Sequence, residues 1–304
     1  MALQDELRDL VEQKASQECG STALLYASTY INQLRSYIDG NTDLSESDIY
    51  NKIDYLAGCL TITLTKPVND LELLRVRVCE DDNFSNIDDL SYIKHPTNNF
   101  PSMGRLNKTG EVLFYASIAL HQSDTALRTV LSEARVKDLD KVNVLRSHQK
   151  TDSDINLRMI GIWDKVRRDD CPYYLSSSVF DYYKEAMTHM EKRFEPKLLR
   201  AYALTDRFFD DLLSRKGTER LYQVTSEVSS LLLHDTSCHG ILYSSVEAKG
   251  EAVIALKPEI VDCAIEHINV TQVHVEKCFG YEFFEYKTLA LAQSIDASSG
   301  LLTW

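Results

Sequence analysis

Two arginines on one segment are the first residues that could bind a charged ligand. Arg75 and Arg77 alternate with the apolar Leu74, Val76 and Val78, so in a strand both guanidinium groups would point to one face. A guanidinium held on a strand is a planar fork for phosphate or carboxylate oxygens. Taken alone, the two arginines favour a solvated or salt-bridged sheet face, and an anion-binding strand is the alternative.

A segment bounded by glycines follows, Gly104-Arg105-Leu106-Asn107-Lys108-Thr109-Gly110, and leads into an apolar run. Glycine lets the backbone approach a ligand closely, and asparagine tolerates turn geometry while offering an amide. The glycine spacing fits neither a Walker loop nor a dinucleotide fingerprint. We expect a turn that binds a ligand through Gly104, Arg105 and Asn107, with a plain connector as the alternative.

Glu133 is a candidate catalytic carboxylate. It lies in an expected helix from about Ser123 to Arg135, at the margin of the arc that apolar residues form on a helical wheel. A carboxylate beside an apolar face is partly desolvated and can line a cleft. Thr129, one turn away, could donate a hydrogen bond to it. The alternative is a rim carboxylate that pairs with Arg135 or a lysine.

The fourth motif, Tyr243-Ser244-Ser245-Val246, follows the apolar run Gly240-Ile-Leu. Hydroxyl groups at a strand end can donate hydrogen bonds to a bound ligand. No G-x-S-x-G elbow surrounds the serines, so a serine hydrolase triad is unsupported. The eight histidines form no H-E-x-x-H pattern, and the seven scattered cysteines form no CxxC pair, so we expect no metal site.

Composition limits the partners and the location. The 304 residues carry a formal charge of −13, which argues against nucleic acid as the main partner because phosphate backbones favour a basic surface. No apolar run reaches the roughly 18 residues that span a bilayer, and the polar, acidic N-terminus is not typical of a signal peptide. With scattered, odd-numbered cysteines, these features favour reduced thiols in the cytoplasm.

Hydrophobic periodicity predicts an α+β fold with helical additions. Helical stripes cover the first 60 residues, Gly40-Asn41 ends one helix, and Ser45 or Ser47 could cap the next. Branched residues alternate as in strands at 61–65, 73–78, 111–117, 141–145, 240–246 and 252–258. Residues 80–102, with Pro96 and Pro101, read as a long loop. Residues 155–235 are again helical. We expect an N-terminal helical region over 1–65 and one α+β domain over 66–304 with a helical insertion at about 155–235.

Taken in order, the four motifs resemble the RES-domain family. Its Arg-x-Arg opening matches Arg75-Val76-Arg77, and its Gly-Arg-x-Asn-x-x-Gly turn matches 104–110. Its Thr-Ala-x-x-Glu-Val-Arg helix matches 129–135, and its Gly-Ile-x-Tyr-x-Ser motif matches 240–245, with Leu256-Lys257-Pro258 in register after it. The resemblance covers about residues 70–265 and the insertion fits it only loosely.

The resemblance implies a fold like that of ADP-ribosyltransferases and a toxin that breaks the nicotinamide–ribose bond of NAD⁺, as a glycohydrolase or phosphorylase. NAD⁺ would be the substrate, with no further cofactor, and the usual partner would be an antitoxin protein that covers the active site. Carried over, Arg75 would hold the pyrophosphate or ribose side of NAD⁺, Glu133 would face the ribose, and Ser245 would complete the pocket. Arg77, Gly104, Arg105, Asn107, Tyr115 and Tyr243 would line the ligand site.

Two further functions stay open. The same fold could transfer ADP-ribose to a macromolecule. A catalytically inactive module that binds NAD⁺ is the other alternative, because Phe114 stands where the family often has tyrosine and Val253 where many members have asparagine. Neighbouring Tyr115 could replace the tyrosine in part. Oligomeric state is not readable from the sequence, and a homo-oligomer stays open.

Overall fold

The computed structural model describes residues 2–17, 19–62, 65–68, 70–79, 83–94, 102–119 and 123–304, with the backbone alone for 2–7, 65–67 and 123. The chain divides into two compact units. The first, here called the helical unit, comprises Met1–Lys66, Gly104–Lys108 and Arg158–Thr236. The second, the sheet unit, comprises Pro67–Met103, Thr109–Leu157 and Ser237–Trp304.

The helical unit is built from helices of the N-terminal 66 residues and of residues 158–236. These are α1 (Ala2–Gln17), α2 (Gly20–Ile38), α3 (Glu46–Asp54) with a π-helical turn (Tyr55–Cys59), α5 (Ile162–Arg167), α6 (Ser177–Arg193), α7 (Pro196–Ser214) and α8 (Glu219–Leu233). The predicted helix starts and stops are found where the sequence places them. Gly40, with φ of 79°, follows the end of α2, and Ser45 rather than Ser47 caps α3 in a capping box with Asp48.

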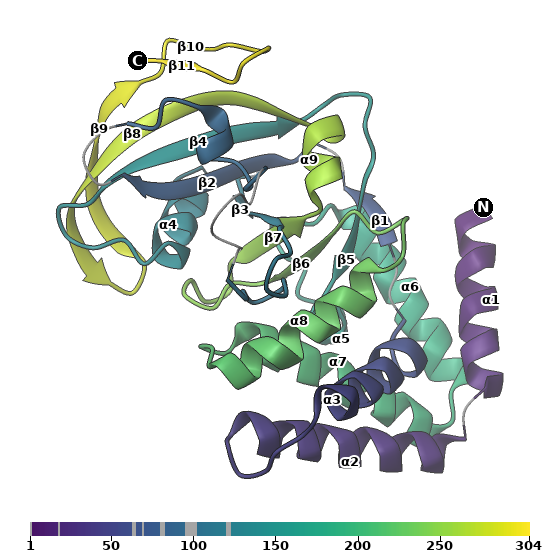
Figure 1. The fold of residues 1–304 in the computed structure, drawn as a ribbon. Helices are drawn as coiled ribbons and strands as arrows, with labels where there is room; N and C mark the ends of the chain where they lie inside the picture. Colours follow the sequence, from purple (N-terminus) through teal and green to yellow (C-terminus); the bar gives the residue numbers. More distant parts are fainter. Residues whose placement is uncertain are drawn as a thin grey trace. The chain divides into compact units, whose positions relative to one another are not determined.

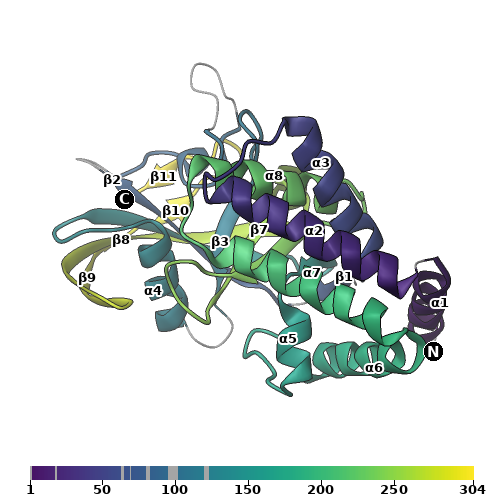
Figure 2. The ribbon, with the colours of Figure 1, turned by 90° about the horizontal axis from the view of Figure 1, so that it is seen from below.

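The N-terminal helices pack on the helices of the predicted insertion. Helix α2 buries Ala23, Ala27, Ile31 and Leu34 and lies beside α7, as Figures 1 and 2 show, while α1 contacts α6 and α3 contacts α8. This division differs from the predicted one, which assigned 155–235 to the domain over 66–304. The physical reason is that the apolar stripe of α7 is buried against α2, a helix that precedes it by more than a hundred residues.

Within the described residues, nine strands form one sheet in the order β1-β5-β6-β7-β3-β2-β4-β8-β9. The strands are β1 (Thr65–Val68), β2 (Glu72–Cys79), β3 (Phe114–Ile118), β4 (Lys141–Gln149), β5 (Ile155–Met159), β6 (Gly240–Ser244), β7 (Ala252–Leu256), β8 (Ile265–Gly280) and β9 (Phe283–Leu291). In this spatial order, each pair of neighbouring strands from β6 to β9 is antiparallel. Two short strands, β10 (Ser294–Ile295) and β11 (Leu302–Thr303), pair separately.

Helix α4 (Ser123–Glu133) covers one face of this sheet. Its Ala126, Val130 and Leu131 share a core with Leu74 of β2 and with valines of β4 and β8. Helix α9 (Pro258–Ala264) joins β7 to β8. Of the predicted long loop, 83–94 contains a single 3₁₀ turn at Ile87–Asp89, whereas 80–82 and 95–101, which include both prolines, lie outside the described residues. Residues 63 and 64 of the first predicted strand also lie outside them, and β1 begins at Thr65.

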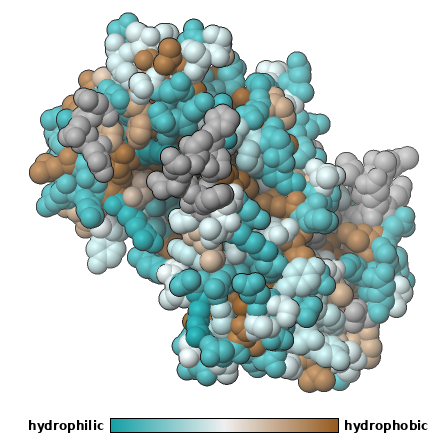
Figure 3. Space-filling model, in the orientation of Figure 1, coloured by the Kyte–Doolittle hydropathy of each residue, from teal (hydrophilic) through white to brown (hydrophobic). Residues whose placement is uncertain are grey.

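The fold is therefore α+β, with helices and a large sheet in one chain. The face in Figure 3 is mostly hydrophilic, with hydrophobic residues scattered over it. In the described part of the chain no helix is long and apolar enough to cross a membrane. All seven cysteines are free thiols.

Candidate active site

Glu133 is fixed by the way α4 ends. The Val136 N–H donates to the Leu131 carbonyl and the Arg135 N–H to the Ser132 carbonyl, which is the hydrogen-bond pattern of a Schellman motif. Arg135 takes the left-handed position with φ of 52°. Glu133 is thereby held in the last turn of the helix, half-buried beside the core that Leu131 and Val130 share with the sheet.

Ser245 meets Glu133 across 112 residues of sequence. Its Oγ donates to Glu133 Oε1 at 2.5 Å, and the backbone N–H groups of Val246 and Glu247 reach the same oxygen at 3.0 and 3.4 Å. Ser245 is 3% exposed, and its Oγ also accepts the Ala248 N–H at 2.9 Å. One turn after β6 therefore supplies every donor to Oε1, and Oε2 has no hydrogen-bond partner among the described residues.

No cation in the described part of the chain pairs with Glu133. Arg135, which the sequence offered as a partner, instead pairs with Glu247 at 3.4 Å. Thr129 does not donate to Glu133 either, because its Oγ1 donates to the Thr125 carbonyl one turn back at 2.9 Å. The carboxylate is positioned by neutral donors, so its negative charge is not cancelled locally.

Arg75 lies on the other side of β2. Leu74 belongs to the core beneath α4, and alternation along the strand turns Arg75 and Arg77 away from that helix. The structure thus brings Glu133 and Ser245 together but does not bring Arg75 to them. This corrects the expectation of a common cavity for all three, which alternation at Leu74 rules out.

The donors of Arg75 are directed at the backbone. Its Nε donates to the Leu90 carbonyl at 2.8 Å and its Nη1 to the Tyr115 carbonyl at 2.7 Å, while the guanidinium lies 5.4 Å from the Phe114 ring centroid. Strands β2 and β3 pair at only two positions, Leu73 with Ile118 and Leu74 with Ser117. Arg75 bridges the strands just beyond these pairs. Burial, with Arg77 nearby, lowers the pKa of Arg75 to about 9, so it stays charged at neutral pH.

Arg77 makes a weaker contact of the same kind. Its Nη2 approaches the Ser91 carbonyl at 3.4 Å, and burial lowers its pKa. Both arginines point to one face, as alternation requires, and that face is covered by 83–94. They hold this segment onto the sheet.

The two tyrosines of the predicted site lie on the α4 side of the sheet. Ser117 donates to the Ala126 carbonyl of α4, and Tyr115 is two residues from it on the same strand. Tyr243 pairs with Val253, which in turn pairs with Ser117, so register places Tyr243 on that side too. Tyr243 is buried and Tyr115 half-buried.

The predicted ligand-binding turn belongs to the helical unit. Gly104 and Asn107 close a turn through a backbone hydrogen bond of 3.0 Å, and Asn107 is buried, with its Nδ2 bonded to the Lys108 carbonyl. Arg105 Nη1 donates to the Leu213 and Arg215 carbonyls at 2.9 and 2.8 Å. These carbonyls lie at the C-terminal end of α7, where helical partners are missing. Arg105 donates to them, so the role of this turn is to cap the C-terminal end of α7.

The groups that sequence reasoning missed are the N–H donors of Val246 and Glu247. Backbone donors carry no side-chain signal, so only the position of the turn, straight after the Tyr243-Ser244-Ser245 motif, hints at them. When the chain is compared with known protein families, characterised proteins and solved structures, nothing matches.

Proposed function

We propose that the chain cleaves the nicotinamide–ribose bond of NAD⁺, with Glu133 as the catalytic carboxylate and Ser245 as the residue that orients it. The hydrogen bond from Ser245 Oγ to Glu133 Oε1 carries this proposal. It joins the residue that the RES-like motifs place facing the ribose, Glu133, to the residue that they assign to completing the pocket, Ser245. The ADP-ribosyltransferase-like fold remains part of the proposal.

The chemistry suits a carboxylate held by one oxygen. The bond from ribose C1′ to the pyridinium nitrogen breaks, and its electron pair leaves with nicotinamide, which departs neutral and needs no general acid. The ribose is left as an oxocarbenium-like cation. The Oε2 of Glu133 has no hydrogen-bond donor among the described residues. A fixed negative charge near the developing cation lowers the barrier most when it needs no reorganisation.

The acceptor defines the reaction type. With water as the acceptor, its oxygen bonds to C1′, a proton goes to solvent, and ADP-ribose forms. Phosphate would give ADP-ribose 1″-phosphate, and a protein side chain would give an ADP-ribosylated product. These three acceptors correspond to a glycohydrolase, a phosphorylase and a transferase.

Arg75 acts in this proposal as a positioning residue. Its bond to the Tyr115 carbonyl fixes β3 next to β2, and Tyr115 and Tyr243 lie on the side of the sheet where Glu133 lies. The half-buried ring of Tyr115 can pack on a flat ring of NAD⁺ there. Depletion of NAD⁺ would make the chain a toxin, and we propose as its partner an antitoxin protein that covers Glu133.

Release of nicotinamide from NAD⁺ by the purified chain, with and without added phosphate, tests the proposal. We expect Glu133→Gln to lower the rate by about 10² to 10³-fold, as loss of one preorganised electrostatic group does. Glutamine keeps an oxygen that accepts from Ser245 and Val246, so the fold should persist. Chromatography of the products and a labelled NAD⁺ reaction separate the three acceptors.

Glu247→Gln is the matched control. It removes a carboxylate from the same turn, but one that pairs with the exposed Arg135. Because an ion pair with an exposed partner is weak, nicotinamide release should stay within about threefold of wild type. Wild-type protein that is folded and binds NAD⁺ without releasing nicotinamide would identify a binding module. Equal rates for wild type and Glu133→Gln would remove Glu133 from the mechanism.

A structural role for Glu133 is the second candidate, because three donors from one turn converge on one oxygen. In that case Glu133→Gln would leave nicotinamide release unchanged, and Glu133→Ala would lower the free energy of unfolding by about 2 kcal/mol through the unsatisfied donors. The activity of Glu133→Gln therefore distinguishes catalysis from anchoring, whereas the stability of Glu133→Ala measures the anchoring in either case.

A further inference from the structure

The helical unit contains a pocket that the proposed NAD⁺ site does not use. The empty space in it is about 750 Å³, a figure that includes the part open to solvent. All of its lining residues belong to the helical unit. They come from the segment after the π-helical turn, the end of β5, and helices α5 to α8.

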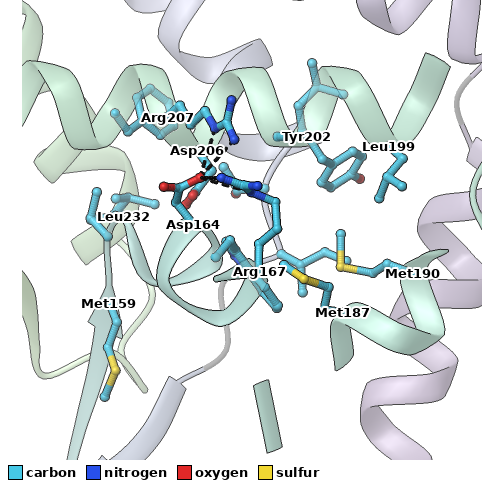
Figure 4. Close-up of a pocket in the computed structure, with 17 residues that line it drawn as sticks. Met159, Asp164, Arg167, Met187, Met190, Leu199, Tyr202, Asp206, Arg207 and Leu232 are labelled. Atoms are coloured by element: carbon cyan, nitrogen blue, oxygen red, sulfur yellow. Dashed lines mark hydrogen bonds and ion pairs between the residues drawn. The ribbon is translucent and has the colours of Figure 1, made fainter. Parts of the chain in front are cut away.

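Most of the wall is apolar and adaptable. Three methionines (Met159, Met187 and Met190) and the rings of Trp163 and Tyr202 line it, and Figure 4 shows Met187, Met190 and Tyr202 around the same space. Unbranched methionine side chains adjust to ligands of different outline. Aromatic rings present a negative face that attracts cations.

One end of the pocket is charged, and the arginines there are paired with Asp164. Asp164 accepts hydrogen bonds from Arg167 at 2.8 Å and Arg207 at 2.9 Å through Oδ1, and from Arg168 at 2.8 Å through Oδ2. Figure 4 shows Arg167 and Arg207 converging on Asp164. These arginines are about half exposed. An anion that bound them would have to compete with Asp164.

Asp206 differs from Asp164, although it lines the same pocket. No arginine or lysine pairs with it in the described part of the chain, and its carboxylate accepts the Gly161 N–H. Arg207, the adjacent cation, is engaged by Asp164. Burial, with Asp210 and Asp164 nearby, raises the pKa of Asp206 to about 7. The pocket therefore holds a carboxylate without a counter-ion next to methionines and aromatic rings.

We propose that this pocket binds a small hydrophobic amine, with the ammonium group against Asp206 and the apolar body between the methionines and the aromatic rings. A protonated amine supplies the missing counter-ion. A carboxylate or phosphate would instead meet Asp206 and Asp164. This site is independent of Glu133 and of NAD⁺.

Trp163 provides a direct readout. The chain has two tryptophans, and the other, Trp304, bonds to the Phe84 carbonyl in the sheet unit. In the full-length Trp304→Phe chain, n-hexylamine, hexanol and hexanoate are titrated at pH 8 while Trp163 fluorescence is followed. We expect saturable binding, with hexylamine at least tenfold tighter than hexanol and hexanoate weakest.

Two variants and a control assign the contacts. Asp206→Asn should weaken hexylamine at least tenfold and leave hexanol within twofold. Ala203→Phe, at an exposed lining residue, should weaken all three probes by filling the space without adding a second tryptophan. Asp169→Asn, an exposed carboxylate paired with Lys184, should change none. Hexanoate binding more tightly than hexylamine, an unchanged hexylamine affinity in Asp206→Asn, or no saturable signal with any probe would each overturn the proposal.

Discussion

Arg75 shows how one side chain can hold two segments of backbone. Its two short hydrogen bonds join β2 to the Leu90 and Tyr115 carbonyls. Hydrogen bonds from a charged donor contribute more than neutral ones, and a buried carbonyl that loses its donor costs free energy. The arginine therefore stabilises the fold in addition to its proposed role as a positioning residue.

Arg75→Met keeps the length of the side chain but removes both donors. We expect it to lower the free energy of unfolding by about 3 kcal/mol, measured by urea denaturation. Arg77→Met is the matched control, because it loses only one contact of 3.4 Å, and should cost less than about 1 kcal/mol. Equal losses in the two variants would contradict this role for Arg75.

At this scale the motifs predicted part of the candidate site. They named Glu133 and Ser245, whose side chains meet. Arg75 does not join them, because strand alternation indicates that Arg75 and Arg77 share a face but not which face packs on α4. That choice depends on Leu74 entering the core, a tertiary event that the strand pattern alone does not encode.

The residue that closes the turn after α4 has an unfavourable backbone conformation. Arg135 is in the left-handed region, where a Cβ costs about 1 kcal/mol and glycine is favoured. The position matters because Glu133 lies in the turn that this residue closes.

Replacing Arg135 by glycine should relieve that cost. Arg135→Ala removes the same charge and the same pair with Glu247 but keeps the Cβ. We therefore expect Arg135→Gly to be more stable than Arg135→Ala by about 1 kcal/mol in thermal or urea unfolding. Alanine matching or exceeding glycine would show that the left-handed conformation is not retained in solution.

Elements with strong periodicity were readable from the sequence. Alternation predicted strands that the structure contains at β2, β3, β4, β6 and β7, with ends that move by a few residues. The long hairpin of β8 and β9 was not predicted. The alternating burial that marks a strand is clear only in the middle of the 16-residue β8, where buried Val273 and Val275 alternate with less buried neighbours. The pairing of β8 with β9 is also interrupted by register shifts.

The two units should respond to acid with opposite signs. Burial raises the pKa of Asp206 in the helical unit to about 7, so the folded state binds a proton more tightly than the unfolded state and gains stability as pH falls from 7. Burial, with Lys94 nearby, lowers the pKa of His267 in the sheet unit to about 4, so stability is lost as pH falls from 6.5 towards 4.

Comparing the free energy of unfolding at pH 7 and pH 5 tests this. Each group accounts for about 2 kcal/mol over this window. Asp206→Asn should make acidification more destabilising than in wild type, and His267→Gln should make it less so. Shifts of the same sign in the two variants would contradict the assignment.

For the whole molecule, the sequence predicted the α+β class but not the grouping of the helices. The stripes of α2 and α7 were both visible as apolar periodicity. Such a stripe shows that a helix must bury a face but does not identify the helix against which it packs, so the pairing of α2 with α7 required the structure.

Each unit is assembled from three stretches of sequence, and the polypeptide passes from one to the other five times. No single cut can therefore yield either unit as a contiguous fragment. A clone that starts at residue 67 would lack α2 and leave the apolar stripe of α7 open to water, which favours aggregation. Protein engineering on this chain should therefore keep all three stretches of each unit together.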